Sequence, residues 1–251
     1  MKWLGRYAGT HDAATRDHLD AIRDLERRKA LLRLIIMALL VLPASVAWAA
    51  ECAPEKMVRI VTRDATPGID PQSFPALPKT LYRLGNGRGR VEEMPDASRG
   101  VHGLIVVNEP DAWIVNLHDK SGRHVVDPGP GLIFRAPILD GGGELPAPLR
   151  ELEFGCELAF VQAYAPKSDE RVDAGGGLML DKHQLSRGDH RVAILVHPKD
   201  RGIYAVAHYK VGKIVRVVRY VEYQQGLAPD ARLFSRPDGI QFAAPRPRAS
   251  R

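Results

Sequence analysis

The chain has 251 residues and 45% of them are hydrophobic, so it is long enough to bury a sizeable core. Its formal net charge is +6 at pH 7, but the first 50 residues carry eight Lys and Arg against five Asp and Glu, and the remainder carries 28 against 25. That small excess, without basic clusters interleaved with aromatic residues, argues against nucleic acid as a partner.

A secretory signal is indicated early in the chain. Four basic residues at positions 27–33 precede an uninterrupted apolar run at 34–42. Pro43 then breaks the helix, and Ala47-Trp48-Ala49 puts small residues where a signal peptidase requires them. We therefore expect cleavage after Ala49 and export to the periplasm.

The alternative is a single-pass inner-membrane anchor formed by uncleaved residues 31–50, through which the protein would associate with the membrane. The apolar run to Ala50 has 17 residues, which is short of the roughly 20 that span a bilayer. The charged stretch ahead of it is long for a signal peptide, so we expect the true translation start to lie downstream of Met1. The predicted organisation is a leader and signal at 1–49, a single β-rich exported domain at 50–244 and a disordered basic tail at 245–251.

Cys52 and Cys156 are the two cysteines of the chain. An even number of cysteines in an oxidising compartment predicts a disulfide, and the alternative is two free thiols. In the chain-entropy description, closing a loop of about a hundred residues adds on the order of 4 kcal/mol to the free energy of unfolding.

From Met57 onward, short runs rich in Val, Ile, Tyr and Phe alternate with clusters of Gly, Pro, Asn and Asp. A spacing of roughly 8 to 12 residues between such runs is typical of antiparallel β structure. Turn residues such as Asn86-Gly87 lie between them. We predict strands at 57–62, 80–84, 88–94, 103–108, 112–118, 123–127, 177–181, 190–197, 202–209 and 213–223.

Two stretches interrupt this pattern. Residues 64–78 hold four prolines, and residues 127–148 combine Pro-Gly pairs with a Gly triplet, so both are predicted to be surface loops. Between Leu149 and Ala163 the apolar residues recur near helical spacing, which predicts one amphipathic helix with Gly155 in its middle.

A polar cluster around the hairpin at 113–124 raises the question of an active site. Asp119-Lys120-Ser121-Gly122 suits a three-residue hairpin loop, and that register sets His118 opposite His124. Opposed Cβ atoms lie about 5 Å apart, close enough for two imidazoles to share a metal ion. A third ligand is absent from the local sequence, so the alternative is an exposed cross-strand histidine pair.

Motifs for other chemistries are absent from the sequence or are explained by turns. The chain contains no Gly-x-Ser-x-Gly, Cys-x-x-Cys or His-Glu-x-x-His motif, and Ser121 falls at a turn tip. The glycine run at 85–89 lacks the Lys-Ser/Thr of a phosphate loop and leads into a strand. We expect no cofactor and no catalytic residue, and an enzyme is the less favoured class.

The strand predicted at 112–118 is apolar on both faces, as Trp113, Val115 and Leu117 alternate with Ile114 and its neighbours. Such a strand fits a sheet that is covered on one face and borders a helix or a ligand on the other. A curved sheet around a helix or a ligand explains the pattern, and so does a two-layer sandwich. We assign the lining of a ligand pocket to Tyr82, Trp113, Val115 and Leu117.

The motifs in three successive segments follow one another in a recognisable order. TLYRLGNGRGRVEEMPD at 80–96 and GLIVVNEPDAWIVNLHDKSGRHVVD at 103–127 run as a strand, a glycine turn, an Arg-Glu strand and a hairpin with a Trp. VRYVEYQQGLAPDARLFSRPDGIQF at 218–242 leads a long strand through a Pro-Asp segment to a last short strand. This order resembles the LolA-like periplasmic half-barrel proteins of the lipoprotein-carrier type, over most of residues 57–243. The alternative is an uncharacterised exported family on a related scaffold.

The resemblance implies an open barrel of about eleven antiparallel strands, plugged by helices, that holds acyl chains in the periplasm. We therefore expect a mainly β fold with a curved antiparallel sheet, an open or half barrel, and one or a few short helices. The expected function is non-enzymatic binding of a hydrophobic ligand, a lipid or lipoprotein acyl chain, or of an envelope protein, in the concave sheet. The alternatives are a metal-dependent envelope enzyme using His118 and His124, or a structural or adaptor protein with the loops 64–78 and 127–148 as contact surfaces.

Overall fold

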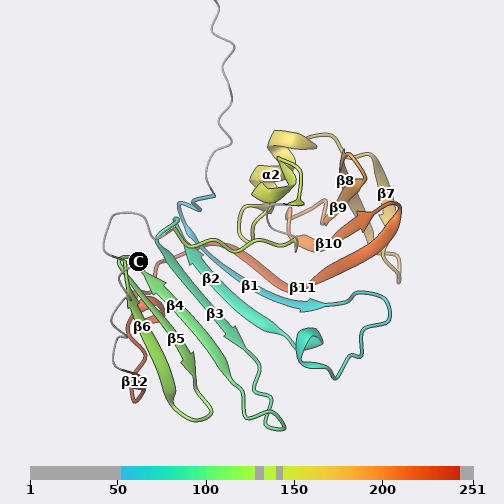
Figure 1. Ribbon diagram of the computed structural model, residues 1–251. Helices are drawn as coiled ribbons and strands as arrows, with labels where there is room; N and C mark the ends of the chain where they lie inside the picture. Colours follow the sequence, from blue (N-terminus) through green and yellow to red (C-terminus); the bar gives the residue numbers. More distant parts are fainter. Residues whose placement is uncertain (1–51, 128–132, 140–143, 244–251) are drawn as a thin grey trace, which may run out of the picture. The chain divides into compact units, whose positions relative to one another are not determined.

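The computed structural model of the protein describes residues 52–127, 133–139 and 144–243, and the predicted signal segment and basic tail lie outside these ranges. The described residues all belong to one compact unit. Their strands are β1 (Met57–Asp64), β2 (Lys79–Leu84), β3 (Arg88–Glu93), β4 (Gly103–Asn108), β5 (Asp111–Asn116), β6 (Ser121–Val126), β7 (Glu170–Asp173), β8 (Met179–Arg187), β9 (His190–Val196), β10 (Ile203–Lys210), β11 (Lys213–Leu227) and β12 (Gln241–Ala243) (Figure 1). The helical segments are the 3₁₀ turns η1 (Phe74–Ala76), η3 (Leu149–Glu151) and η4 (Ala231–Phe234), and the α-helix α2 (Glu157–Tyr164).

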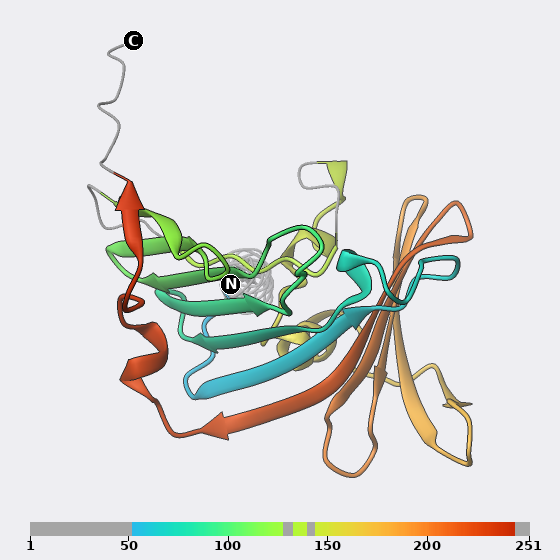
Figure 2. The same cartoon turned by 90° about the horizontal axis from the view of Figure 1, so that it is seen from below.

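The twelve strands form a single sheet in the order β12-β6-β5-β4-β3-β2-β1-β11-β10-β9-β8-β7. Neighbouring strands are antiparallel except for β12, which pairs in parallel with β6. The sheet is curved and does not close into a barrel (Figure 2). The predicted mainly β fold, with an open, curved antiparallel sheet, is confirmed.

The ten predicted strands correspond to β1–β6 and β8–β11, with shifted ends. The sequence pattern does not predict β7, because its four residues, ERVD, carry three charged side chains and show no apolar alternation. Its Arg171 forms an ion pair with Asp181 of β8, Nε to Oδ1 at 3.0 Å. A short, charged edge strand of this kind is held by its neighbour and not by a buried face.

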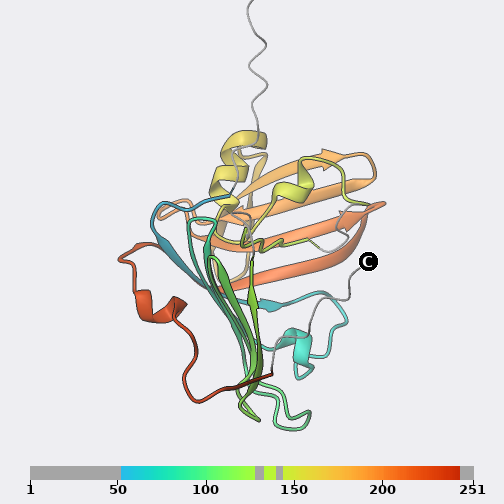
Figure 3. The same ribbon diagram turned by 60° about the vertical axis from the view of Figure 1, so that its left-hand side comes forward.

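β11 connects the two groups of strands within the sheet, β1–β6 and β7–β10. Its first part, Lys213–Arg219, pairs with β10, and its later part, Val218–Leu227, pairs with β1. The pairing with β1 contains two register shifts, and such bulges bend a strand and increase its twist. The sheet therefore turns at β1 and β11, with β2–β6 on one side of the bend and β7–β10 on the other (Figures 2 and 3).

The concave face of the bent sheet carries the larger core. Apolar residues from both sides of the bend meet α2 and the segment 133–139, and their buried members include Ile60, Leu81, Val206, Val218, Ile138, Leu149 and Val161. The prediction of a surface loop at 127–148 is therefore wrong for 133–139. Phe134, Ala136 and Ile138 are buried there, although the flanking Pro and Gly residues resemble those of an exposed loop.

The predicted helix at 149–163 is divided by Gly155. This residue has a φ of +90°, a conformation that helices do not use and that side chains other than glycine rarely adopt. As a result η3 ends before Gly155 and α2 begins after it. None of the helices in the described ranges combines the length and the hydropathy that crossing a bilayer requires.

The predicted disulfide between Cys52 and Cys156 is confirmed, with the two Cα atoms 5.7 Å apart. It connects the beginning of the described chain to the residue that precedes α2, across a sequence separation of 104. A structural disulfide of this kind is consistent with an oxidising compartment outside the cytosol.

Arg83, at the end of β2, is fully buried and ion-paired. Its Nη1 lies 2.8 Å from Oε2 of Glu153, which is 2% exposed. Its remaining N–H groups donate to backbone carbonyls of Cys52, Gly85, Phe134 and Phe154 at distances of 2.7 to 3.3 Å. One guanidinium therefore holds four segments of the chain against the concave face.

Glu157, in the first turn of α2, is a second buried carboxyl group. It accepts hydrogen bonds from the Tyr220 hydroxyl at 2.7 Å, the Tyr223 hydroxyl at 3.2 Å and the Gly155 N–H at 3.0 Å. Burial raises its pKa above the ordinary 4.5, against the opposing effect of these hydrogen bonds.

Replacing Arg83 by Met should lower the free energy of unfolding by about 3–5 kcal/mol, because Glu153 keeps only the half-exposed Arg135 as a partner and four carbonyl groups lose their donor. Adding Glu153→Leu should restore part of the loss, since the buried charge is removed with it. Urea denaturation measures both, with the exposed Arg88→Met on the next strand as control. A single Arg83→Met variant as stable as this control would contradict the role given to Arg83.

Glu157 should make the protein less stable as the pH rises. A carboxyl group whose pKa is raised by folding contributes stability that is fully present below the unfolded value of about 4.5 and is lost as the pH passes the folded value. The unfolding free energy of the wild type should therefore fall relative to that of Glu157→Gln over this range. Denaturation series at several pH values measure the difference, with the exposed Glu55→Gln as control. Parallel curves for wild type and Glu157→Gln would show that Glu157 does not titrate differently on folding.

Candidate functional site

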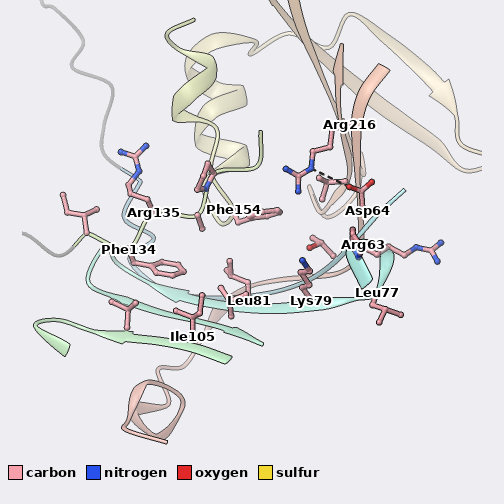
Figure 4. Close-up of a pocket in the computed structure, with 18 residues that line it drawn as sticks. Arg63, Asp64, Leu77, Lys79, Leu81, Ile105, Phe134, Arg135, Phe154 and Arg216 are labelled. Atoms are coloured by element: carbon pink, nitrogen blue, oxygen red, sulfur yellow. Dashed lines mark ion pairs between the residues drawn. The ribbon is translucent and has the colours of Figure 1, made fainter. Parts of the chain in front are cut away.

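An apolar cavity of about 470 Å³ opens on the concave face (Figure 4). The sheet forms its floor and residues 133–137 with Phe154 form its roof, while Pro75 and Leu77 close one side. The full lining is Thr62, Arg63, Asp64, Pro75, Leu77, Lys79, Leu81, Val91, Ile105, Val107, Ile133, Phe134, Arg135, Ala136, Pro137, Phe154, Arg216 and Val218.

The floor follows from the register of three strands. Leu81 of β2 is opposite Val91 of β3, and Val91 is opposite Ile105 of β4. Directly opposed residues of antiparallel strands point to the same face, so these three side chains make one continuous apolar row. Ile105 is 41% exposed at the open side of the row.

The roof is irregular in conformation, and Arg83 holds it in place. The Phe134 carbonyl accepts from Nη2 of Arg83 at 3.0 Å, and the Phe154 carbonyl accepts from Nη1 at 3.2 Å. Gly89 of β3 permits the Phe134 ring to lie directly on the sheet, because a Cβ atom at this position would come within 2.5 Å of the ring. Backbone hydrogen bonds from Phe134 to Asn86 at 2.7 Å and from Phe154 to Ala136 at 2.9 Å hold the roof as well.

Charged and polar side chains gather at the two ends of the cavity. At the end formed by β1, β2 and β11 lie Thr62, Asp64, Lys79 and Arg216, and Nε of Arg216 is 3.9 Å from Oδ2 of Asp64. At the other end, Arg135 forms an ion pair with the buried Glu153. The middle is apolar, so the cavity suits a molecule with a long apolar part and a polar end.

The four residues predicted to line a pocket do not line this cavity. Trp113 and Val115 are buried on the opposite, convex face with Leu104 and Val106, and Leu117, Ile240 and Phe242 pack against them. Tyr82 also lies on the convex side, where its hydroxyl accepts from Nε of Arg59 at 3.1 Å. The strands are apolar on both faces as expected, but the cavity uses the alternate residues.

The predicted pairing of His118 with His124 is wrong. In the observed register Asn116 is opposite Ser121, and His124 is opposite Trp113. The loop holds four residues in place of three, and His118 lies within it. The His124 ring stacks on Trp113 with centroids 5.4 Å apart, and its Nε2 is 2.6 Å from Oδ1 of Asp111.

The reason for this difference in register is local. The expected loop is Lys120–Gly122, whereas the observed loop is Leu117–Lys120, so the turn begins three residues earlier and Ser121 and Gly122 belong to β6. Lys120 takes a positive φ of 57° inside the observed loop, a conformation that glycine adopts far more readily than lysine. The sequence therefore does not indicate a turn at this position. The register that would oppose the two histidines is therefore not formed.

Metal-ligand geometry is not found elsewhere in the part of the chain that the structure describes. No three side chains of His, Cys, Asp or Glu come together there as a metal ion would require. The metal-enzyme alternative therefore loses the histidine pair on which it depended.

Sequence reasoning missed the residues that do line the cavity. Leu81 precedes the assigned Tyr82 on the same predicted strand, and Ile105 lies on the strand next to that of Trp113. Both are apolar residues of predicted strands, so the sequence pattern includes them. Phe134 and Phe154 are not marked by any alternation of apolar and polar residues, because they lie in segments without regular periodicity.

Neither the protein-family models nor the curated protein sequences contain a match to this chain. Among solved structures, an uncharacterized conserved protein from Thermus thermophilus is 13% identical over 75% of this chain and 90% of its own, with a TM-score of 0.43. PNGF-II is 11% identical over 74% of this chain, which spans 30% of PNGF-II, with a TM-score of 0.26. At these values neither similarity bears on what the chain binds.

Proposed function

We propose that this protein binds the acyl chain of a lipid or lipoprotein in the concave cavity, without catalysing a reaction on it. The observation that carries the proposal is the cavity itself, whose volume of about 470 Å³ falls within the range of roughly 300–1,000 Å³ typical of small-molecule sites. Its floor and roof are apolar, and Ile105 and Ile133 keep apolar surface exposed beside it.

The proposed location is the periplasm, reached through the signal predicted at 27–49. The Cys52–Cys156 disulfide supports this location because such bonds persist in oxidising compartments. An open curved sheet with an apolar concave face also agrees with what the LolA-like resemblance implies, namely an acyl chain held in the half barrel.

Purified protein should bind a fluorescent fatty acid and release it to unlabelled competitors. Ile105→Glu places a carboxylate at the open side of the apolar floor and should weaken binding by at least about tenfold, because a bound acyl chain would cover that charge without giving it a partner. Fluorescence titration measures the affinity, and native mass spectrometry of protein isolated from cells shows whether a lipid accompanies it.

The matched control is Val221→Glu, which introduces the same charge at an exposed apolar position of β11 outside the cavity lining. It should leave the affinity within about twofold of the wild type. If neither the wild type nor the control binds the probe, and no lipid accompanies the protein, acyl-chain binding is ruled out. Equal weakening by both variants would place binding somewhere other than the cavity.

A further inference from the structure

We infer that the β8–β9 and β10–β11 turns, which lie at one end of the sheet, dock on the surface of an anionic lipid bilayer. Cationic side chains at this end contact the phosphate groups of the lipids, while apolar side chains of the β10–β11 turn enter the headgroup region. The inference goes beyond the proposed function, because it concerns a surface outside the cavity lining.

A row of basic side chains crosses this end of the sheet. Arg187 of β8 is opposite His190 of β9, which is also opposite Lys210 of β10. Lys210 is in turn opposite Lys213 of β11. Directly opposed residues point to the same face, so the four side chains share one face of the sheet. Neighbouring strands are about 4.8 Å apart, so the row is roughly 14 Å long.

The exposed cations of this row are not neutralised by the protein. Within the described ranges, Lys210 and Lys213 form no ion pair, and Arg187 donates only to a backbone carbonyl, at 2.8 Å. The acid of the β8–β9 turn, Asp189, has its Oδ1 3.3 Å from Nε2 of His190. Like charges placed directly opposite each other destabilise a sheet, so folding alone does not account for the Lys210–Lys213 pair.

Val211, in the turn between β10 and β11, is 71% exposed, more than any other large apolar side chain in the described ranges. Its φ of 50° lies in the left-handed region, where a β-branched residue is unusual and glycine or asparagine is preferred. Ile214 and Val215, which follow in β11, are 42% and 47% exposed. Neither the turn nor the core requires a valine at this position, and an unexplained residue in a rare backbone conformation points to a function.

The two turns form one surface. The Val211 N–H donates to the Asp189 carbonyl at 2.8 Å, so the β8–β9 and β10–β11 turns lie side by side (Figure 2). From this turn β11 continues to Arg216 and Val218, which line the cavity. A bilayer bound at the turns would therefore lie close to one end of the cavity.

Exposed apolar side chains flanked by cations suit the boundary of a membrane. Anionic lipids attract Lys and Arg side chains near their surface, and apolar side chains enter the region between headgroups and acyl chains. Lys210 precedes Val211 and Lys213 follows it two residues later, so the ammonium groups can reach phosphates beside an inserted valine. An acidic polymer with no apolar phase would use the cations but would leave Val211 in water.

The test measures cosedimentation of the full-length protein with two kinds of vesicle, phosphatidylcholine alone and phosphatidylcholine mixed with phosphatidylglycerol. The mixed vesicles should bind at least about tenfold more tightly, since each cation near an anionic surface contributes. Added salt should reduce this preference. Equal binding to the two kinds of vesicle would overturn the inference. Basic residues elsewhere in the chain also contribute to the preference, so variants are needed to assign it to the turns.

Charge reversal at the β10–β11 turn, Lys210→Glu with Lys213→Glu, should weaken binding to the mixed vesicles by at least about tenfold. The matched control is Lys199→Glu with Arg201→Glu. It makes the same change in net charge at exposed positions of the β9–β10 turn, at the other end of the same strands. The control should weaken binding by no more than about threefold, because charges far from the contact are screened.

Val211→Ser keeps the charge of the turn and removes its most exposed apolar side chain. It should weaken binding to the mixed vesicles by about three- to tenfold, because less apolar surface leaves the water. Displacement of the protein from heparin, an acidic polysaccharide, should be the same for this variant and the wild type.

Two results of the variants would overturn the inference. Equal weakening by the two charge-reversal pairs would show that net charge, and not the turns, determines binding. Binding to vesicles that Val211→Ser leaves unchanged would mean a partner recognised by charge alone, such as an acidic polysaccharide. The substituted residues lie outside the cavity lining, so every variant should still bind the acyl probe. Failure of the wild type to bind that probe would overturn the proposed function and leave this inference in place.

Discussion

Arg83 carries its charge inside the protein with no contact to water, and the arrangement of the concave face follows from satisfying it. A buried guanidinium is tolerated only when an anion and several acceptors surround it. Glu153 supplies the anion, and carbonyl groups of Cys52, Gly85, Phe134 and Phe154 supply the acceptors. Apart from Gly85, which follows Arg83 by two residues, the acceptors come from distant parts of the sequence, so these parts must converge on the end of β2 when the chain folds.

The contacts of Arg83 hold the roof, residues 133–137 with Phe154, in a fixed position over the sheet although it has no regular secondary structure. Residues 133–137 have no continuous strand partner, only the isolated bridge between Pro137 and Glu153. Their position depends on Arg83, on the fit of the Phe134 ring over Gly89, and on the disulfide that fixes the chain just after Phe154. A roof fixed before the ligand arrives reduces the ordering entropy that binding would otherwise cost.

The sequence predicts the strands well because each has a period of two, and it predicts the class of fold for the same reason. It does not predict which face of a strand borders the cavity. Leu81 and Tyr82 are both apolar enough to serve, and a shift of one residue exchanges the two faces of a strand. The choice depends on where residues 133–139 and the segment after β11 lie, and both are set by contacts between residues far apart in the sequence.

The two faces of β4 and β5 both carry apolar side chains, but these side chains differ in how far they are buried. On the convex face Trp113 and Val115 are buried under Ile240 and Phe242 of the last segment. On the concave face Ile105 and Ile114 are directly opposed across the same two strands, yet they are 41% and 48% exposed. A pair of partly exposed isoleucines is ordinary on a protein surface, so its position beside the cavity matters more than its size. Because they continue the row that begins at Leu81, the exposed surface lies where a chain longer than the cavity would extend.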